Sequence, residues 1–135
     1  MRDATHDRTV WIVDGNNVMG AVVRGWWNDP PAASARLAAA VARWCVEHPD
    51  RDVILLFDGK PHDTVAQQAG GNLRIEFAPK PKRDAADDRI VELVDELFAD
   101  HQLTVATSDR GLVDRLPPGV SVIGGGAFGR SLGRV

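Results

Sequence analysis

Short apolar runs alternate along the chain with longer stretches in which apolar residues recur every three or four positions. The apolar runs predict β-strands at residues 10–13, 53–57, 73–77, 103–106 and 120–123. The periodic stretches predict helices at residues 18–23, 30–48, 85–101 and 110–116, with a short helix within 62–71. Alternating strands and helices are typical of a parallel sheet with right-handed crossovers and helices on both faces. The predicted fold class is therefore α/β, with a central, mostly parallel sheet of about five strands.

Signals at the helix faces and ends refine this prediction. One core-facing stripe consists of Leu37, Ala40, Val41, Trp44 and Cys45, and a second of Ala86, Ile90, Leu93, Val94 and Leu97. Asp29 is a candidate N-cap, because Pro30 follows it at the first helical position. Beyond the last predicted strand, Gly124-Gly125-Gly126 leads into what we interpret as a basic tail.

Composition limits the class of protein. The 135 residues are 44% hydrophobic, so we expect one domain at 9–135 with a flexible leader at 1–8. The net charge of -3 argues against a protein that coats nucleic acid indiscriminately. Cys45 is the only cysteine, which indicates a buried core residue in a reducing compartment. The chain has no apolar signal segment and no run of membrane-spanning length, so we expect a soluble, cytoplasmic protein.

An aspartate stands where three of the predicted strands end. Asp14 and Asp58 directly follow apolar runs, and Asp109 comes after Thr107-Ser108 at the end of a third. Parallel strands point the same way and bind ligands at their carboxyl ends, so these acids should share one edge of the sheet. Each acid taken alone also has an ordinary explanation. Asp14 and Asp58 precede glycines in turn-forming pairs, and Asp109 can cap the following helix.

A fourth acid comes from the segment 84–89. Asp87 shares a helical stripe with apolar residues and leans inward, whereas Asp88 lies on a polar face that we expect to point to water. Asp84 fits the N-cap, which places Asp87 at the third helical position. Asp84 and Asp87 are equally explained as an acidic capping box that complements the helix dipole.

Acids that share one edge repel one another unless a cation lies among them. A ligand set of oxygens without cysteine or histidine favours Mg²⁺ or Mn²⁺ over Zn²⁺. Such an ion with a retained water is suited to phosphodiester hydrolysis. We expect Asp14 and Asp109 to bind the metal directly, Asp87 to hold or deprotonate the attacking water, and Asp58 to tune the site or bind through water. Asn17 is a candidate for orienting a phosphate oxygen or water, although turn chemistry explains it equally well.

With these residues identified, the sequence resembles the YacP-like branch of the NYN domain family, within the PIN-like nuclease superfamily. The resemblance rests on the segments VDGNNVMGA, LLFDG, RDAADDRIVELV and VATSDRGL, with GWWNDP and GGGAF typical of the same branch. It implies a PIN-like three-layer α/β/α sandwich, acids that bind Mg²⁺ or Mn²⁺, and RNA cleavage associated with RNA processing or ribosomes.

Carried over by position, the resemblance makes Asp14, Asp58, Asp87 and Asp109 the metal-binding acids and Asn17 the amide of the motif. Asn16 stands where a tyrosine is common in the branch. The chain ends soon after Ser131, so we expect it to lack the longer C-terminal helix of some relatives.

A basic loop leads directly into the helix that carries Asp87. Lys80, Lys82 and Arg83 could hold an RNA backbone beside the metal, and the prolines among them reduce the entropy cost of binding. A solvated basic loop that balances the acids is the alternative.

Two further groups of residues could contact RNA. Arg110 and Arg130 belong to a locally basic last quarter of the chain, where phosphate contacts would make binding sensitive to salt. Trp26 and Trp27 lie in a loop after the Asp14 motif, where an exposed ring could stack on a base; a core position for one of them is the alternative.

The sequence therefore predicts a metal-dependent endoribonuclease. A non-catalytic module that binds RNA or the ribosome and keeps the same fold is the alternative of a different class. A phosphatase or receiver-like phosphoacceptor is less consistent, because no lysine follows the fifth strand and no D-x-D follows the first.

Overall fold

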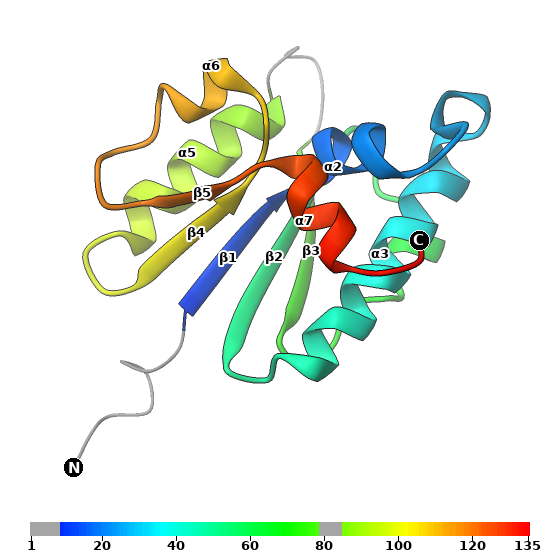
Figure 1. The fold of residues 1–135 in the computed structure, drawn as a ribbon, viewed down its shortest axis with the longest axis horizontal. Helices are drawn as coiled ribbons and strands as arrows, with labels where there is room; N and C mark the ends of the chain where they lie inside the picture. The colour runs from blue at the N-terminus through cyan, green and yellow to red at the C-terminus, as the bar shows by residue number, and fades with distance from the viewer. Residues whose placement is uncertain (1–8, 79–84) are drawn as a thin grey trace.

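The computed structural model of the chain describes residues 9–78 and 85–135 (Figure 1). In this part of the chain, one sheet has the strand order β3-β2-β1-β4-β5, and every neighbouring pair of strands is parallel. The strands are β1 (Thr9–Asp14), β2 (Arg51–Asp58), β3 (Leu73–Ala78), β4 (Gln102–Ala106) and β5 (Ser121–Ile123). The predicted α/β fold with a parallel five-stranded sheet is confirmed.

Helices cover both faces of this sheet. One layer contains α2 (Gly15–Val22), the 3₁₀-helix η1 (Trp26–Asn28), α3 (Pro30–Glu47), α4 (Asp63–Ala66) and α7 (Gly125–Ser131). The opposite layer contains α5 (Ala85–Leu97) and α6 (Arg110–Val113). These three layers form the predicted α/β/α sandwich. None of the helices in the described residues is both long and apolar enough to cross a bilayer.

The continuous apolar run of β2 is explained by the two helical layers. Along this strand Val53, Leu55 and Phe57 pack into the core beneath α3, whereas Ile54 and Leu56 face α5. A strand that is covered on both faces needs an apolar residue at every position. All residues of the predicted α3 stripe are buried, and in the α5 stripe only the last member, Leu97, is half-buried.

Several element ends differ from the predicted ones. Helix α2 begins at Gly15, directly after β1, with Asp14 at the N-cap position. Helix α3 begins as predicted, with the side chain of Asp29 accepting a hydrogen bond from Ala32 N–H at 3.2 Å. Helix α5 already ends at Leu97, and α6 contains only residues 110–113.

The interpretation of the C-terminal segment as a tail is wrong, because residues 125–131 form α7. Glycine disfavours helix by about 1 kcal/mol per residue, so the local sequence gives little sign of it. Tertiary packing outweighs this cost: Phe128 is fully buried, and Gly129 lies so close to Val22 that a Cβ atom there would overlap with it. Helix α7 therefore depends on its contact with α2.

The order of the strands determines where on the sheet a ligand site is expected. Successive connections run from β1 toward β2 and β3, and then cross back to β4 on the other side of β1. Ligands of open α/β sheets bind where the order reverses, outside the carboxyl ends of the strands. In this fold that point lies between β1 and β4. The predicted leader at residues 1–8 lies outside the described residues.

Candidate active site

The carboxyl ends of β1, β2 and β4 bring three of the predicted acids to one edge of the sheet. Asp14 ends β1, Asp58 ends β2, and Asp109 is the N-cap residue of α6, which follows β4. Strand β1 is paired with both β2 and β4, so Asp14 lies between the other two acids. The sequence predicts that these acids share one edge, and the structure adds the order in which they lie along it.

Asp14 is buried, with only 5% of its surface exposed. Burial raises the pKa of its carboxyl group, and the negative charges of Asp109 and Asp58 raise this pKa further. A hydrogen bond from the Thr107 hydroxyl to Asp14 Oδ2, 2.8 Å long, and the backbone N–H of Asn17 act in the opposite direction. Both neighbouring acids are therefore close enough to repel the Asp14 carboxylate, and a cation would relieve this repulsion.

Thr107 connects two of the acids and was not a predicted site residue. Its side chain is 1% exposed; its hydroxyl donates to Asp14 and accepts a hydrogen bond from the backbone N–H of Asp109 at 3.1 Å. The sequence pattern that could have indicated this role is a hydroxyl residue directly after β4 and two positions before an aspartate. Local capping explained that pattern as well, so the sequence alone did not indicate the contact with Asp14.

Asp58 connects the end of β2 to the helix that carries the fourth acid. Its Oδ1 atom accepts a hydrogen bond from the backbone N–H of Ala86, in the first turn of α5, at 3.0 Å. Asp87 is the next residue of that turn and is half-buried. Asp84, the predicted N-cap of this helix, lies outside the described residues. Asp58 therefore satisfies a helix N–H that a cap residue would otherwise satisfy.

The Asp88 side chain is 35% exposed, and its carboxylate forms an ion pair of 2.9 Å with the exposed Arg115, from the segment after α6. Because the helix α5 packs beside α6 in the same layer, an arginine from that segment can reach it. Asp87 and Asp88 are both half-buried, so burial does not separate them.

Asp109 caps α6, because its Oδ1 atom accepts a hydrogen bond from Leu112 N–H at 3.2 Å. Helix capping is the alternative explanation that the sequence offers for this residue.

Among the residues that the structure describes, no three His, Cys, Asp or Glu side chains form a group that could hold a metal ion. The donor chemistry nevertheless fits a hard cation, because Mg²⁺ is commonly bound through one or two carboxylates and several waters. Asp14 and Asp109, which repel one another, are the residues that could provide them.

Two consecutive asparagines hold the strand ends on either side of β1. Asn16 Oδ1 accepts a hydrogen bond from Asp58 N–H, and Asn17 Oδ1 accepts one from Ser108 N–H, each at 2.8 Å. Asn17 was predicted to orient a phosphate or water, but its oxygen is used in this contact. No role was predicted for Asn16, because its partner is 42 positions away in the sequence.

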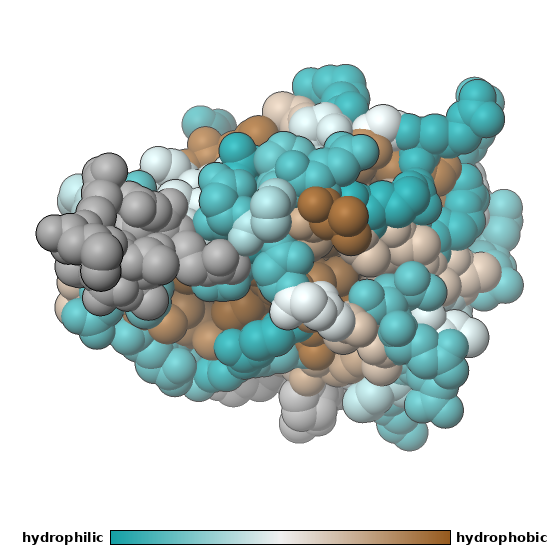
Figure 2. Space-filling model, turned by 90° about the horizontal axis from the view of Figure 1, so that it is seen from below, coloured by the Kyte–Doolittle hydropathy of each residue, from teal (hydrophilic) through white to brown (hydrophobic). Residues whose placement is uncertain are grey.

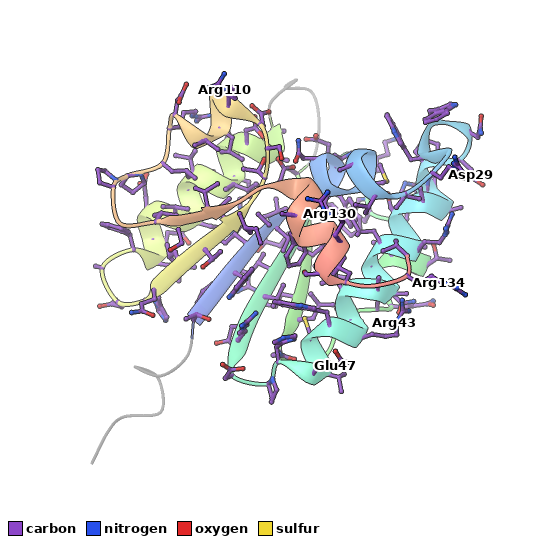
Figure 3. All side chains as sticks on the ribbon, in the orientation of Figure 1. Asp29, Arg43, Glu47, Arg110, Arg130 and Arg134 are labelled. Atoms are coloured by element: carbon purple, nitrogen blue, oxygen red, sulfur yellow. The ribbon has the colours of Figure 1, made fainter. Side chains whose placement is uncertain are left out.

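The predicted RNA-contacting residues lie in different parts of the structure. Trp27 is 65% exposed, whereas Trp26 is partly buried and packs against the core. Arg110 and Arg130 are exposed on α6 and α7, where Figure 3 labels them. Lys80, Lys82 and Arg83 lie outside the described residues.

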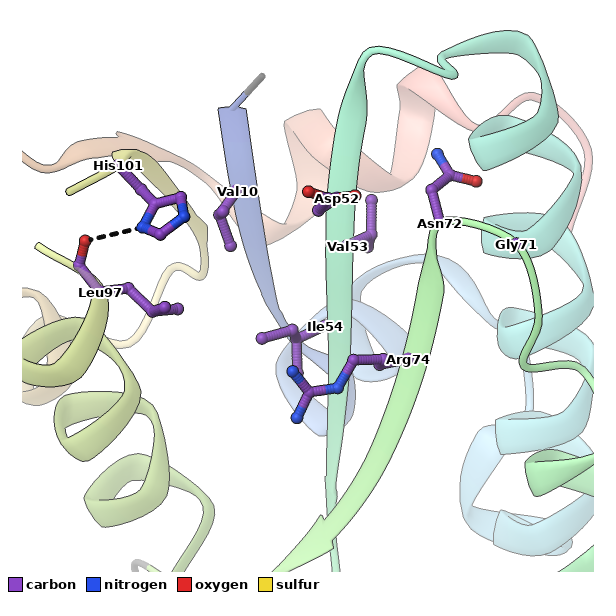
Figure 4. A pocket seen from close by; sticks show the side chains of 9 residues that line it. All are labelled: Val10, Asp52, Val53, Ile54, Gly71, Asn72, Arg74, Leu97 and His101. Carbon is purple, nitrogen blue, oxygen red and sulfur yellow. Dashed lines mark hydrogen bonds between the residues drawn. The ribbon is translucent and has the colours of Figure 1, made fainter. Parts of the chain in front are cut away.

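A cavity of about 300 Å³ lies at the opposite, amino-terminal edge of the sheet (Figure 4). It is lined by the first residues of β1, β2 and β3 and by the end of α5, including Asp52, Arg74 and His101. Figure 2 shows this edge, where apolar surface is visible between hydrophilic side chains. Of the predicted site residues that the structure describes, none lines the cavity.

Comparisons with known proteins agree with the resemblance stated from the sequence. Residues 11–114 match the model of the YacP-like NYN domain. The structure is similar to a crystal structure of a point mutant of Rae1 (YacP) from Bacillus subtilis, with a TM-score of 0.67 and 22% sequence identity. That alignment covers 92% of this chain and 74% of the other. The unmutated Rae1 structure gives a TM-score of 0.65 at 22% identity, covering 91% of this chain and 72% of the other.

A more distant similarity is to the T5 D15 protein, which was co-crystallised with metal ions. Its TM-score is 0.57 at 13% identity, and the alignment covers 87% of this chain and 54% of the other. No curated protein sequence is significantly similar to the chain. The fold is thus that of the PIN-like nucleases, and, because the domain model matches most of its length, the chain belongs to the YacP-like NYN domain family.

Proposed function

We propose that this protein is a Mg²⁺- or Mn²⁺-dependent endoribonuclease that hydrolyses phosphodiester bonds in single-stranded RNA, in RNA processing or decay. The observation that carries the proposal is the buried Asp14 carboxylate, whose pKa is raised by burial and by the nearby charges of Asp109 and Asp58. Three carboxylates at the carboxyl edge of a parallel sheet repel one another, and a divalent cation bound there would relieve this repulsion. With a single cysteine, buried in the core, the chain suits the reducing cytoplasm, where we place this activity.

Each acid takes a separate role in this proposal. Asp14 and Asp109 would hold the cation, and Asp58, whose Oδ1 atom already accepts from Ala86, would act on it through water. The bound ion supplies a Lewis acid and a water of lowered pKa. Asp87 accepts the proton of the water that attacks phosphorus. One P–O ester bond then breaks, and the leaving oxygen takes a proton from solvent. Thr107 keeps the Asp14 carboxylate in place throughout.

Exposed aromatic and basic residues on three separate elements support RNA as the substrate. The ring of Trp27 is available for a base, and stacking of this kind contributes roughly 1–3 kcal/mol per base. Arg110 and Arg130 are exposed cations on α6 and α7 that can contact phosphates. The ribosome association that the family resemblance implies would use the same basic surface.

Cleavage of a fluorescently labelled single-stranded RNA tests the proposal. We expect Asp14→Asn to abolish cleavage in Mg²⁺ or Mn²⁺ while the circular dichroism spectrum stays native. Asp100→Asn is the matched control, because this exposed aspartate follows α5 at the other end of the sheet. Equal cleavage by wild type and Asp14→Asn would contradict the mechanism.

A non-catalytic RNA- or ribosome-binding module is the second candidate, and one observation favours it. Asp58 and Asp109 each cap a helix, and the described residues contain no ready-made group of metal ligands. This candidate predicts RNA binding that is unaffected by EDTA, together with no cleavage by the wild type in any divalent cation. The same RNA, measured by fluorescence anisotropy with and without EDTA, separates the two candidates.

A further inference from the structure

The central strand of the sheet ends earlier than its neighbour. Asp14, the last residue of β1, is paired with Leu56, whereas β2 continues to Asp58. The N–H of Gly59 donates to Ala78 of β3 at 2.9 Å. Because successive N–H groups of a strand point to opposite sides, that of Asp58 points toward the space beyond β1. The side chain of Asn16 provides the missing acceptor there, at 2.8 Å.

The same replacement occurs on the other side of β1. Thr107 N–H donates to Ile123 of β5 at 2.9 Å, so the next N–H, that of Ser108, points back toward β1. Asn17 Oδ1 accepts this hydrogen bond at 2.8 Å. The first turn of α2 therefore continues the hydrogen bonding of β1 through two side chains, one for each neighbouring strand. A buried or half-buried N–H without such a partner would cost stability.

A close contact between α2 and β2 makes the Asn16 hydrogen bond possible. A Cβ atom at Gly15 would lie 2.5 Å from the backbone oxygen of Leu56 and 2.7 Å from the ring of Phe57. Only a residue without a side chain fits this position. The helix consequently begins against the backbone of β2, with Asn16 within reach of Asp58.

Asp58 links the position of Asn16 to that of Asp87, the fourth acid. Its backbone N–H is held by Asn16, and its Oδ1 atom accepts from Ala86 N–H at 3.0 Å. Ala86 precedes Asp87 in the first turn of α5. A short path of two hydrogen bonds thus connects the helix that follows Asp14 with the helix that carries Asp87.

We propose that Asn16 is a positioning residue of the candidate metal centre, which sets the place of Asp58 and, through it, of Asp87 relative to Asp14. This inference rests on the proposed function, because positioning matters only if these acids hold a cation. Residues that orient metal ligands typically contribute 10- to 100-fold to metal affinity or activity, and we expect an effect of about this size. Asn17 acts differently, because its partner Ser108 is not an acid.

The test compares Asn16→Ala, Asn16→Asp and the control Asn72→Ala. Alanine removes the acceptor, whereas aspartate has the same shape and keeps an oxygen for the Asp58 N–H. Asn72→Ala deletes the same atoms at the other edge of the sheet, where Asn72 Nδ2 donates to the backbone carbonyls of Cys45, His48 and Arg51. Asn72→Ala therefore shows how a loss of stability alone affects the readouts, because it changes nothing at the carboxyl edge of the sheet.

The readouts are hydrogen exchange at the amides of Asp58 and Ala86, Mn²⁺ affinity by isothermal titration calorimetry, and kcat and KM for RNA. For Asn16→Ala we expect faster exchange at both amides, Mn²⁺ binding weakened by about 10- to 100-fold, and a lower kcat with KM little changed. Asn16→Asp should restore slow exchange together with Mn²⁺ affinity. Asn72→Ala should leave all three readouts near those of the wild type.

Two results would overturn the positioning role alone, in a wild type that binds Mn²⁺. One is unchanged amide exchange and Mn²⁺ affinity in Asn16→Ala. The other is Asn16→Asp being as defective as Asn16→Ala in amide exchange, which would show that an acceptor oxygen at this position does not hold Asp58. A wild type that binds no Mn²⁺ would contradict the proposed function itself, and the positioning role with it.

Discussion

At the scale of single residues, Asp14 shows most directly that the carboxylate required by the proposed chemistry is costly for the stability of the fold. A buried carboxylate is costly unless it is paired or well hydrogen-bonded, and two further acids lie close to this one. The Thr107 hydroxyl offsets only part of that cost. The position is therefore stabilised by neutralisation, either by a proton or by a bound cation.

Asp14→Asn should stabilise the metal-free protein at neutral pH. The folded-state pKa of Asp14 lies above its ordinary value of 3.8, so the protonated form favours folding, and this contribution is lost as pH rises through the folded-state pKa. The amide is neutral at every pH and can still accept from Thr107. Thermal melting in EDTA should show equal stability of the two proteins at low pH and a higher Tm for Asp14→Asn near pH 7. A lower Tm for the variant at pH 7 would contradict this explanation, and Asp100→Asn serves as the control.

Cys45 should be chemically inert in the folded protein. The side chain is buried in the core beneath α3, and burial raises the pKa of its thiol to about 11. Only the thiolate reacts with disulfide reagents, so access and ionisation both oppose modification. We expect no reaction with Ellman's reagent at pH 8 in buffer and one equivalent of thiol in denaturant. Rapid reaction of the native protein would show that α3 opens readily.

At the scale of elements, α7 shows what the local pattern leaves out. The strands and the longer helices follow from their apolar periodicity, which depends on neighbours within a few positions. Helix α7 is rich in glycine and is stabilised by contacts with α2, from more than a hundred positions earlier in the chain. Its glycines, which disfavour a helix in isolation, are the residues that permit this close approach.

Gly129→Ala tests the packing of α7 on α2. The added methyl group overlaps with Val22, a stiff β-branched side chain, so we expect the free energy of unfolding to fall by about 1–3 kcal/mol. Val22→Ala in the same protein should recover part of the loss, which a double-mutant cycle in urea measures.

Gly20→Ala is the matched control for that experiment. At this position in α2 the new methyl group would meet only Trp26 Nε1, at 3.9 Å. It should therefore stabilise the protein by roughly 0.5–1 kcal/mol, as expected for glycine replaced inside a helix. If both substitutions changed stability equally, close packing at Gly129 would not be the cause.

At the scale of the whole molecule, the strand order decides which residues meet. Strand ends that carry Asp14, Asp58 and Asp109 could be predicted to share an edge, because alternating strands and helices imply parallel strands. The order that places β1 between β2 and β4 could not be predicted, since it rests on pairing between distant segments such as β1 with β4, whose ends are also joined by the hydrogen bond of Thr107 with Asp14, 93 positions apart. The same distance in sequence hid the role of Thr107.

Binding of a cation at this edge should stabilise the whole domain. A ligand at 100 times its dissociation constant adds about 2.7 kcal/mol if it binds only the folded state, which corresponds to a rise in Tm of roughly 10 °C for a domain of this size. We expect this rise for wild type and Asp100→Asn when Mn²⁺ replaces EDTA. Asp14→Asn should show no rise, although its Tm in EDTA is the higher one. Both results have one cause, the Asp14 charge between Asp58 and Asp109. This charge lowers the stability of the metal-free protein, and the same charge is needed for the cation to raise it. A wild type whose Tm is the same in EDTA and in millimolar Mn²⁺ would show that these acids repel one another without binding a cation, and the edge would then serve RNA binding without cleavage.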